Sequence, residues 1–182
     1  ARRVWGLMNT PGWGFGLAAS SLVGQALGAG EEATAESYGR EITRFSVATY
    51  PVAALVVAAL AEPVVRLFVD SPTDPSVPVA VGMVYVAAVA VVPQGVTSAV
   101  AGALDATGDT RWPFYSRALG MVGVSLPLVY LGATTGLGIV GVYLSFFGET
   151  LVPAVVNHYR FSTGKWKAIS RSFRPEARPA DD

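Results

Sequence analysis

Charged residues are distributed unevenly along this chain and leave long uncharged windows between them. Four windows contain no Asp, Glu, Lys or Arg: residues 4–30, 45–61, 76–104 and 118–148. A helix that crosses a bilayer needs roughly 20 mainly apolar residues, so each of the first three windows predicts one span. The fourth window is longer, and the glycine-rich segment 132–138 predicts a tight turn that divides it into two spans.

The pattern therefore predicts five helices, near residues 4–29, 40–61, 78–104, 113–132 and 137–159. Short connections are expected at 30–39, 70–78 and 107–112, and segment 62–70 is expected to continue the second helix to the membrane interface. Hydrophobic residues make up 52% of the chain and charged residues 14%, whereas soluble domains average about 25% charged residues. We predict an all-α membrane protein, a bundle of five transmembrane helices.

The placement of basic residues predicts how the bundle is oriented, because Arg and Lys accumulate in short cytoplasmic loops. Ten basic residues fall on one side of the predicted bundle, and the loops of the other side hold only Arg66. Residues 161–182 are therefore predicted to be a basic, partly disordered cytoplasmic tail of a multi-pass protein in the cell membrane. Arg2 and Arg3 fit this rule only within a longer helix whose start is missing, so the sequence is interpreted as cut from a larger protein.

Charge and cysteine content narrow the classes of partner. The net charge is zero and there is no cysteine, so no basic excess indicates a nucleic-acid partner and no thiolate metal site is expected. The lipid bilayer is the expected partner of the apolar helices. His158 is the one histidine, and we expect no metal site around it.

Small residues recur every four positions in the first window: Gly12, Gly16, Ser20, Gly24 and Gly28. On a helix they form one ridge, along which membrane helices approach closely. The same segment contains a G-x-G-x-x-A pattern, which in dinucleotide-binding folds follows a strand and opens a helix. No strand candidate precedes Pro11, so the segment is interpreted as a helix-packing face.

Three segments resemble the multidrug and toxic compound extrusion (MATE) transporter family, in the family's order and at its spacing. They are L-V-G-Q-A-L-G-A-G-E-E-A-T-A-E at 22–36, A-G-A-L-D-A-T-G-D-T-R-W-P at 101–113 and Y-R-F-S-T-G-K-W-K at 159–167. The resemblance implies twelve helices in two six-helix lobes, of which this chain would hold most of helix 8 and helices 9 to 12. It also implies that the missing N-terminal lobe of the same chain is a partner.

The resemblance implies a secondary antiporter, and not an enzyme, that exports organic, often cationic or amphipathic, small molecules. Na⁺ or H⁺ would be the coupling ion, and no other cofactor is expected. Two positions depart from the family pattern. Gln94 stands where some sodium-driven members carry an acidic residue, and Asp105 stands where many members have a basic one.

Glu149 is the main candidate for transport chemistry, because it lies near the middle of the last predicted helix. A charge at that depth costs a few kcal/mol and usually faces a partner or a water-filled cavity. Glu149 could accept a proton or a cation, or contact a cationic substrate. It could equally be a protonated, hydrogen-bonded side chain that holds two helices together.

Three further residues are candidates for transport or coupling. Arg3 could line a cavity, snorkel to the interface or pair with a carboxylate of the missing lobe. Asn9 precedes the Pro11 kink and could contact substrate. Gln94 follows Pro93, which frees a backbone carbonyl, so Gln94 could line an unwound polar spot or have a structural role.

Two alternative functions remain open. A lipid-linked saccharide flippase of the same superfamily would need a strongly basic cavity, for which only Arg2 and Arg3 are candidates. A membrane-embedded enzyme would need converging acids, bases or metal ligands, and the predicted spans offer one mid-membrane Glu and no His near their middle.

Overall fold

The computed structural model describes the backbone of residues 2–68 and 75–173, and within these ranges the side chains from residue 12 onward. The described residues are helical and contain no strand. The helices are α1 (Arg2–Gly28), α2 (Glu32–Ala59), α3 (Ala61–Arg66), α4 (Ser76–Ala106), α5 (Arg111–Ala118), the π-helix η1 (Leu119–Ser125), α6 (Leu126–Thr134), α7 (Ile139–Ser162) and α8 (Trp166–Ser172).

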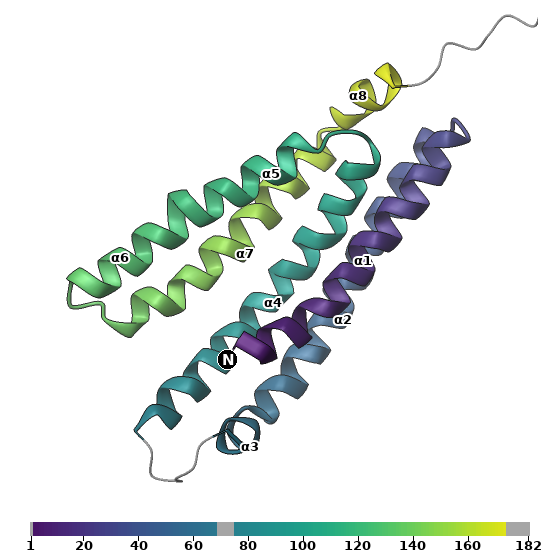
Figure 1. Cartoon of the computed structure of the whole chain (residues 1–182). Coiled ribbons are helices and arrows are strands. Elements are labelled where there is room, and N and C mark those ends of the chain that lie inside the picture. Colours follow the sequence, from purple (N-terminus) through teal and green to yellow (C-terminus); the bar gives the residue numbers. More distant parts are fainter. Residues whose placement is uncertain (1, 69–74, 174–182) are drawn as a thin grey trace, which may run out of the picture.

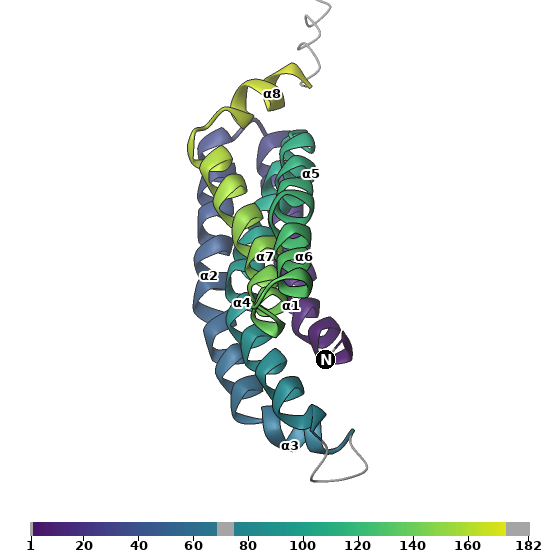
Figure 2. The same ribbon diagram turned by 90° about the vertical axis from the view of Figure 1, so that its left-hand side faces the viewer.

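Five long helical segments, here called rods, run side by side along one axis (Figures 1 and 2): α1, α2, α4, the run α5–η1–α6, and α7. One rod is the continuous helix made of α5, η1 and α6. The α1–α2 and α4–α5 connections lie at the end of the bundle that carries α8, here the α8 end. The short helix α3 and the α6–α7 turn lie at the opposite end, here the α3 end.

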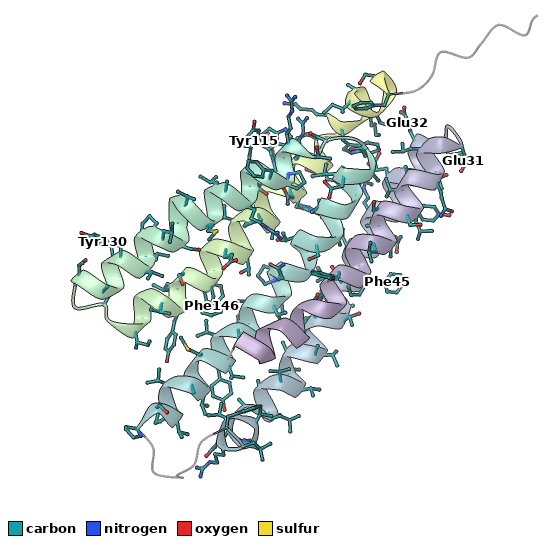
Figure 3. The ribbon with its side chains drawn as sticks, in the orientation of Figure 1. Glu31, Glu32, Phe45, Tyr115, Tyr130 and Phe146 are labelled. Carbon is teal, nitrogen blue, oxygen red and sulfur yellow. The ribbon has the colours of Figure 1, made fainter. Side chains whose placement is uncertain are left out.

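Four of the rods are long and apolar enough to cross a membrane, within the part of the chain that the structure describes: α2, α4, α7 and the rod Arg111–Thr134. Large apolar side chains such as Phe45 and Tyr130 are more than half exposed and point away from the bundle (Figure 3). Water does not favour so much exposed apolar surface on a small protein, whereas acyl chains do. The predicted fold class is confirmed: this is an all-α, multi-pass membrane protein.

α4 lies in the middle of the bundle and contacts α1, α2 and α7. Its C-terminal half contributes Ala99, Val100, Ala103 and Leu104 to the main buried cluster, together with residues of α1, α2, α7 and α8. Many of these side chains are small. The driving force between membrane helices is packing rather than escape from water, so small residues at the contacts are expected.

Glycines make the closest helix crossings. A Cβ on Gly102 of α4 would lie 2.1 Å from the carbonyl oxygen of Gly16 in α1. A Cβ on Gly141 of α7 would lie 2.6 Å from the Cα of Gly132 in α6. No side chain fits at either crossing, because the neighbouring atoms belong to backbone.

Three predicted boundaries differ from the structure. The second helix begins at Glu32, well inside the connection expected at 30–39, because a polar first turn can be helical outside the apolar span and its Glu favours the helix N-terminus. Segment 62–70 does not continue this helix: α2 ends at Ala59 and α3 follows, since Pro63 has no N–H to bond the Ala59 carbonyl. The tail expected at 161–182 begins with the end of α7 and α8, and residues 174–182 lie outside the described residues.

Candidate functional site

Hydroxyl groups connect α4 and α7 near the middle of the bundle. The Thr97 hydroxyl of α4 donates to the Thr150 carbonyl of α7 at 3.1 Å. The Thr150 hydroxyl in turn donates to the Phe146 carbonyl one turn earlier, at 2.8 Å. Both threonines are buried, and a hydroxyl in an apolar interior must be hydrogen-bonded to avoid a large cost.

A second hydroxyl contact joins η1 to α7 at a similar depth. The Ser125 hydroxyl donates to the Ser145 carbonyl at 2.7 Å. A Cβ on Gly120 of η1 would lie 2.5 Å from the Gly148 carbonyl oxygen, so the two backbones pack directly. The π-helix ends just before Pro127, whose missing N–H interrupts the regular bonding. Such π-helical turns are rare and frequently lie at functional sites.

Glu149 lies between two buried neighbours on α7, Gly148 and Thr150, yet is itself exposed. Pro153 follows four residues later inside the same helix and has no N–H to donate to the Glu149 carbonyl. The residue therefore presents a side-chain carboxylate and a backbone carbonyl without its usual helical donor. Glu149 directly precedes Thr150, whose carbonyl accepts the Thr97 hydroxyl.

The exposed position of Glu149 bears on its two interpretations. A side chain that held two of the described helices together would be buried between them, and Glu149 is not. A carboxylate facing acyl chains at mid-depth costs a few kcal/mol, so such groups normally face a water-filled cavity or another protein segment. The face of α7 that carries Glu149 is therefore a candidate cavity wall.

Gln94 fits one of its two interpretations, the structural role, better than the other. α4 is helical through Pro93, so there is no unwound segment at this point. Gln94 is 7% exposed and lies inside the bundle. Pro93 is accommodated because neighbouring helices can satisfy the freed backbone groups in a membrane protein.

Arg3 and Asn9 belong to α1, but their side chains lie outside the described part of the structure. Their roles stay predictions.

The predicted small-residue ridge on α1 faces other helices along part of its length. Gly12 is buried, a Cβ on Gly16 would lie 3.2 Å from the Ser98 carbonyl oxygen, and a Cβ on Gly24 would lie 3.9 Å from the Ala106 Cβ. Ser20 is half-buried. Gly28 differs, since a Cβ there would have no neighbour within 4 Å.

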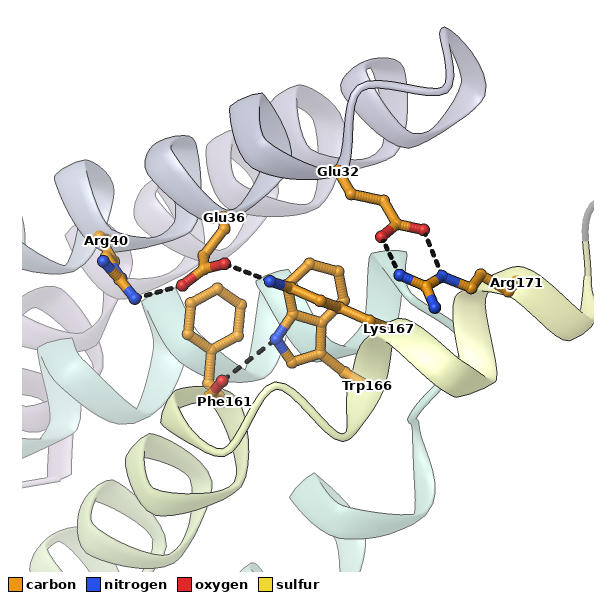
Figure 4. Close-up of polar contacts among 7 residues, drawn as sticks. All are labelled: Glu32, Glu36, Arg40, Phe161, Trp166, Lys167 and Arg171. Carbon is orange, nitrogen blue, oxygen red and sulfur yellow. Dashed lines mark hydrogen bonds and ion pairs between the residues drawn. The ribbon is translucent and has the colours of Figure 1, made fainter.

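At the α8 end, charged side chains hold α8 against the start of α2 (Figure 4). Lys167 donates to Glu36 at 2.5 Å, and Glu36 also pairs with Arg40. Arg171 donates twice to Glu32, at 2.8 and 2.7 Å. This bonding raises the pKa of the Arg171 guanidinium, which therefore stays charged.

Aromatic packing beneath these ion pairs fixes α8 to α7. Trp166 is fully buried, stacks on Phe161 with ring centroids 5.5 Å apart, and donates its indole N–H to the Phe161 carbonyl at 3.1 Å. Phe161 in turn packs on Gly39 of α2, where a Cβ would lie 2.4 Å from the ring. The tail therefore begins as a packed part of the bundle.

A buried ion pair closes the α4–α5 turn onto α7. Arg160 donates to Asp109 at 2.6 Å, and the two side chains are 13% and 4% exposed. The Arg160 guanidinium also lies 5.0 Å from the centre of the Trp112 ring. Together with the α8 contacts, this pair links α2, α7, α8 and the α4–α5 turn at the α8 end.

Thr97, Thr150 and Ser125 are the residues at mid-depth that reasoning from the sequence missed. Single hydroxyl residues in apolar windows are common and carry no distinctive spacing. The one available signal is indirect: the helices that carry these hydroxyls contain prolines at 93, 127 and 153, and α1 and α2 contain Pro11 and Pro51 as well, so the signal is not specific.

Polar groups at mid-depth in a multi-pass helix bundle with interrupted helices are typical of a membrane transporter. A family model described as MatE matches residues 1–131. The chain belongs to the MatE family, as the sequence motifs indicated.

Two curated relatives are similar to this chain. The multidrug resistance protein NorM of Burkholderia vietnamiensis is 29% identical over 151 residues, which cover 81% of this chain and 33% of NorM. The uncharacterized transporter YisQ of Bacillus subtilis (strain 168) is 32% identical over 68 residues, 37% of this chain and 15% of YisQ. The chain thus spans about a third of NorM in that match. No solved structure matches it significantly.

Proposed function

We propose that this chain forms most of one lobe of a secondary antiporter that exports organic, often cationic or amphipathic, compounds in exchange for Na⁺ or H⁺. Membership of the MatE family and the similarity to a multidrug resistance protein support export as the activity. A second lobe, supplied by the rest of the same polypeptide, would complete the cavity. Alternating access would then rock the two lobes about a substrate held between them.

The exposed carboxylate of Glu149 at mid-depth is the observation that carries this proposal. A carboxylate in a cavity of low polarity binds either a proton, a metal cation or a cationic group, and binding one excludes the others. That competition couples the two movements, since the ion that enters displaces the cationic substrate. Gln94, Arg3 and Asn9 are secondary candidates, of which Gln94 is buried within the bundle.

The ion pairs at the α8 end support movement of the lobe as one body. The Asp109–Arg160 pair joins the α4–α5 turn to α7, and the Glu36–Lys167 pair joins α2 to α8. Charge placement supports a cytoplasmic location for this end in the cell membrane.

The alternative functions have less support. A saccharide flippase would favour a basic cavity, whereas the polar side chains described at mid-depth are hydroxyls, one amide and one carboxylate. Among the described residues, no three His, Asp or Glu side chains gather as a metal site would require. An embedded metalloenzyme therefore has no candidate centre in this part of the chain.

The test uses the full-length protein in sealed vesicles loaded with a fluorescent cationic dye. A Na⁺ gradient and a proton gradient are imposed separately, and dye movement is measured for the wild type, Glu149→Gln and Glu62→Gln. Glu62 is a matched control, because this exposed carboxylate pairs with Arg66 at the α3 end. One gradient should drive export in the wild type and in Glu62→Gln, and export should fall at least tenfold in Glu149→Gln.

The outcomes separate the activity from the residue. If neither gradient drives export by the wild type, the antiporter proposal is wrong. If the gradient drives export equally well in Glu149→Gln, the antiporter proposal holds and the role of Glu149 is wrong.

A further inference from the structure

An apolar groove runs along the side of the bundle between α2 and α7, with α4 as its floor. Its volume is about 870 Å³. Val47 of α2, Val92 and Val96 of α4, and Leu151 and Val155 of α7 line its middle. The three helices are membrane spans, so the groove opens at the depth of acyl chains.

The groove is long enough to cross the hydrocarbon core of one leaflet of a bilayer. On α7 it extends from Phe147 to Ser162, a helical rise of about 22 Å at ~1.5 Å per residue. The hydrocarbon core of one leaflet is about 15 Å thick, half of the whole. An acyl chain could therefore lie in the groove along its full length, with its polar end near Ser162.

The lining becomes polar at the Ser162 end only. Thr43 of α2 and His158, Tyr159 and Ser162 of α7 surround that end. Tyrosine is enriched where membrane and water meet, with its ring in the apolar layer and its hydroxyl among headgroups. The groove thus has one apolar end at mid-depth and one polar end at the interface.

The polar end also carries excess positive charge. Within two helical turns of Thr43 lie two basic side chains and two carboxylates: Arg40, Arg44, Glu36 and Glu41. Two more basic residues, Lys165 and Lys167, follow Ser162. The net charge of these six side chains is +2. Figure 4 shows that Arg40 and Lys167 share the single carboxylate of Glu36. One positive charge of this trio is not neutralised and is available to an anion.

We propose that this groove binds one acyl chain of an anionic glycerophospholipid, with its phosphate headgroup against the basic side chains at the Ser162 end. An aliphatic lining suits an acyl chain, and basic pockets between membrane helices suit anionic headgroups. Arginine binds phosphate oxygens through two parallel N–H donors. Arg44 donates to Glu41 through one nitrogen at 2.7 Å and is 73% exposed, so its other N–H donors face the surroundings. The proposal rests on the groove and does not depend on the transported substrate.

The test uses the full-length protein in lipid nanodiscs that contain a trace of photoactivatable phospholipid, with the reactive group near the end of the acyl chain. One sample contains the phosphatidylglycerol form and another the phosphatidylcholine form, and labelled peptides are identified by mass spectrometry. Peptides around Leu151 and Val155 should carry several-fold more label from phosphatidylglycerol than from phosphatidylcholine.

Three variants separate the acyl-chain contact from the headgroup contact. Val155→Trp places a large ring in the groove and should reduce labelling several-fold. Val52→Trp is its control, since Val52 is similarly exposed on α2 but does not line the groove. Arg40→Gln combined with Arg44→Gln should abolish the preference for phosphatidylglycerol while labelling of the groove continues. Gel filtration of each variant checks that it folds.

Equal labelling by the two lipids in the wild type would overturn the anionic assignment. Unchanged labelling in Val155→Trp would show that no lipid occupies the groove. The same conclusion would follow if cysteines introduced in the groove formed cross-links to another segment of the same polypeptide.

Discussion

The closest contact between α1 and α4 provides the sharpest test of the packing. Gly102→Ala adds one methyl group at a point where it would lie 2.1 Å from the Gly16 carbonyl oxygen and 2.9 Å from the Gly16 Cα. Both atoms belong to the backbone of α1, so no side chain can rotate away to make room. The two helices must separate along their whole contact.

The expected destabilisation follows from this geometry. Extra methyl groups in a well-packed core cost about 1–3 kcal/mol, which is roughly a 5- to 150-fold change in the unfolding equilibrium. Gly14→Ala is the control, because Gly14 lies two residues before Gly16 in α1 but is exposed, and a Cβ there meets no atom within 4 Å. The higher helix propensity of Ala should change the free energy of unfolding little in Gly14→Ala, since membrane helices stay helical when they separate.

The assay is reversible unfolding of the full-length protein in mixed micelles, followed by tryptophan fluorescence. Gly102→Ala should unfold at clearly lower denaturant than the wild type, and Gly14→Ala should not. If the two variants unfold within about 0.5 kcal/mol of each other, a difference that independent small effects produce, then α1 does not cross α4 at these glycines.

Three further changes test the polar contacts. Asp109→Asn leaves Arg160 buried without its partner and should lower the free energy of unfolding by about 3–5 kcal/mol. The double variant with Arg160→Gln should recover part of this loss in the same assay. If the effects of the two substitutions simply add, the pair is not coupled. Thr97→Val removes the bond to the Thr150 carbonyl and should cost about 0.6 kcal/mol, the average for hydrogen bonds between membrane helices; no change would mean that the bond contributes nothing. Arg171→Gln removes an exposed pair with α2 and should lower the stability only slightly, by an amount that salt diminishes; a large loss that is insensitive to salt would contradict a solvated ion pair.

Much of the fold could be predicted from the sequence, because crossing a bilayer is a property of individual segments. The uncharged windows around residues 76–104 and 118–148 predicted helices that the structure contains as α4, the rod Arg111–Thr134 and α7. The start of α2 at Glu32 was missed because the prediction relied on the same uncharged windows. Hydropathy marks the apolar part of a helix and does not detect a polar turn that extends beyond it.

The candidate site was less predictable, because it depends on how each helix is rotated. Gln94 and Glu149 both stand in apolar segments, and nothing local distinguishes them. The structure turns Gln94 into the bundle, at 7% exposure, and Glu149 out of it. Pro93 gave no unwound segment either, since the surrounding helices hold α4 straight through it.

The sequence by itself determined that this chain lies in a membrane, where most of its spans begin and end to within a few residues, the start of α2 excepted, and which family it belongs to. Each of these follows from residue types in a local segment. Only the tertiary structure decided which glycines form helix crossings, which hydroxyls join α4, η1 and α7, and which face of α7 carries an exposed carboxylate. Those features arise between segments far apart in the chain, where packing of neighbouring backbones sets the rotation and depth of every helix.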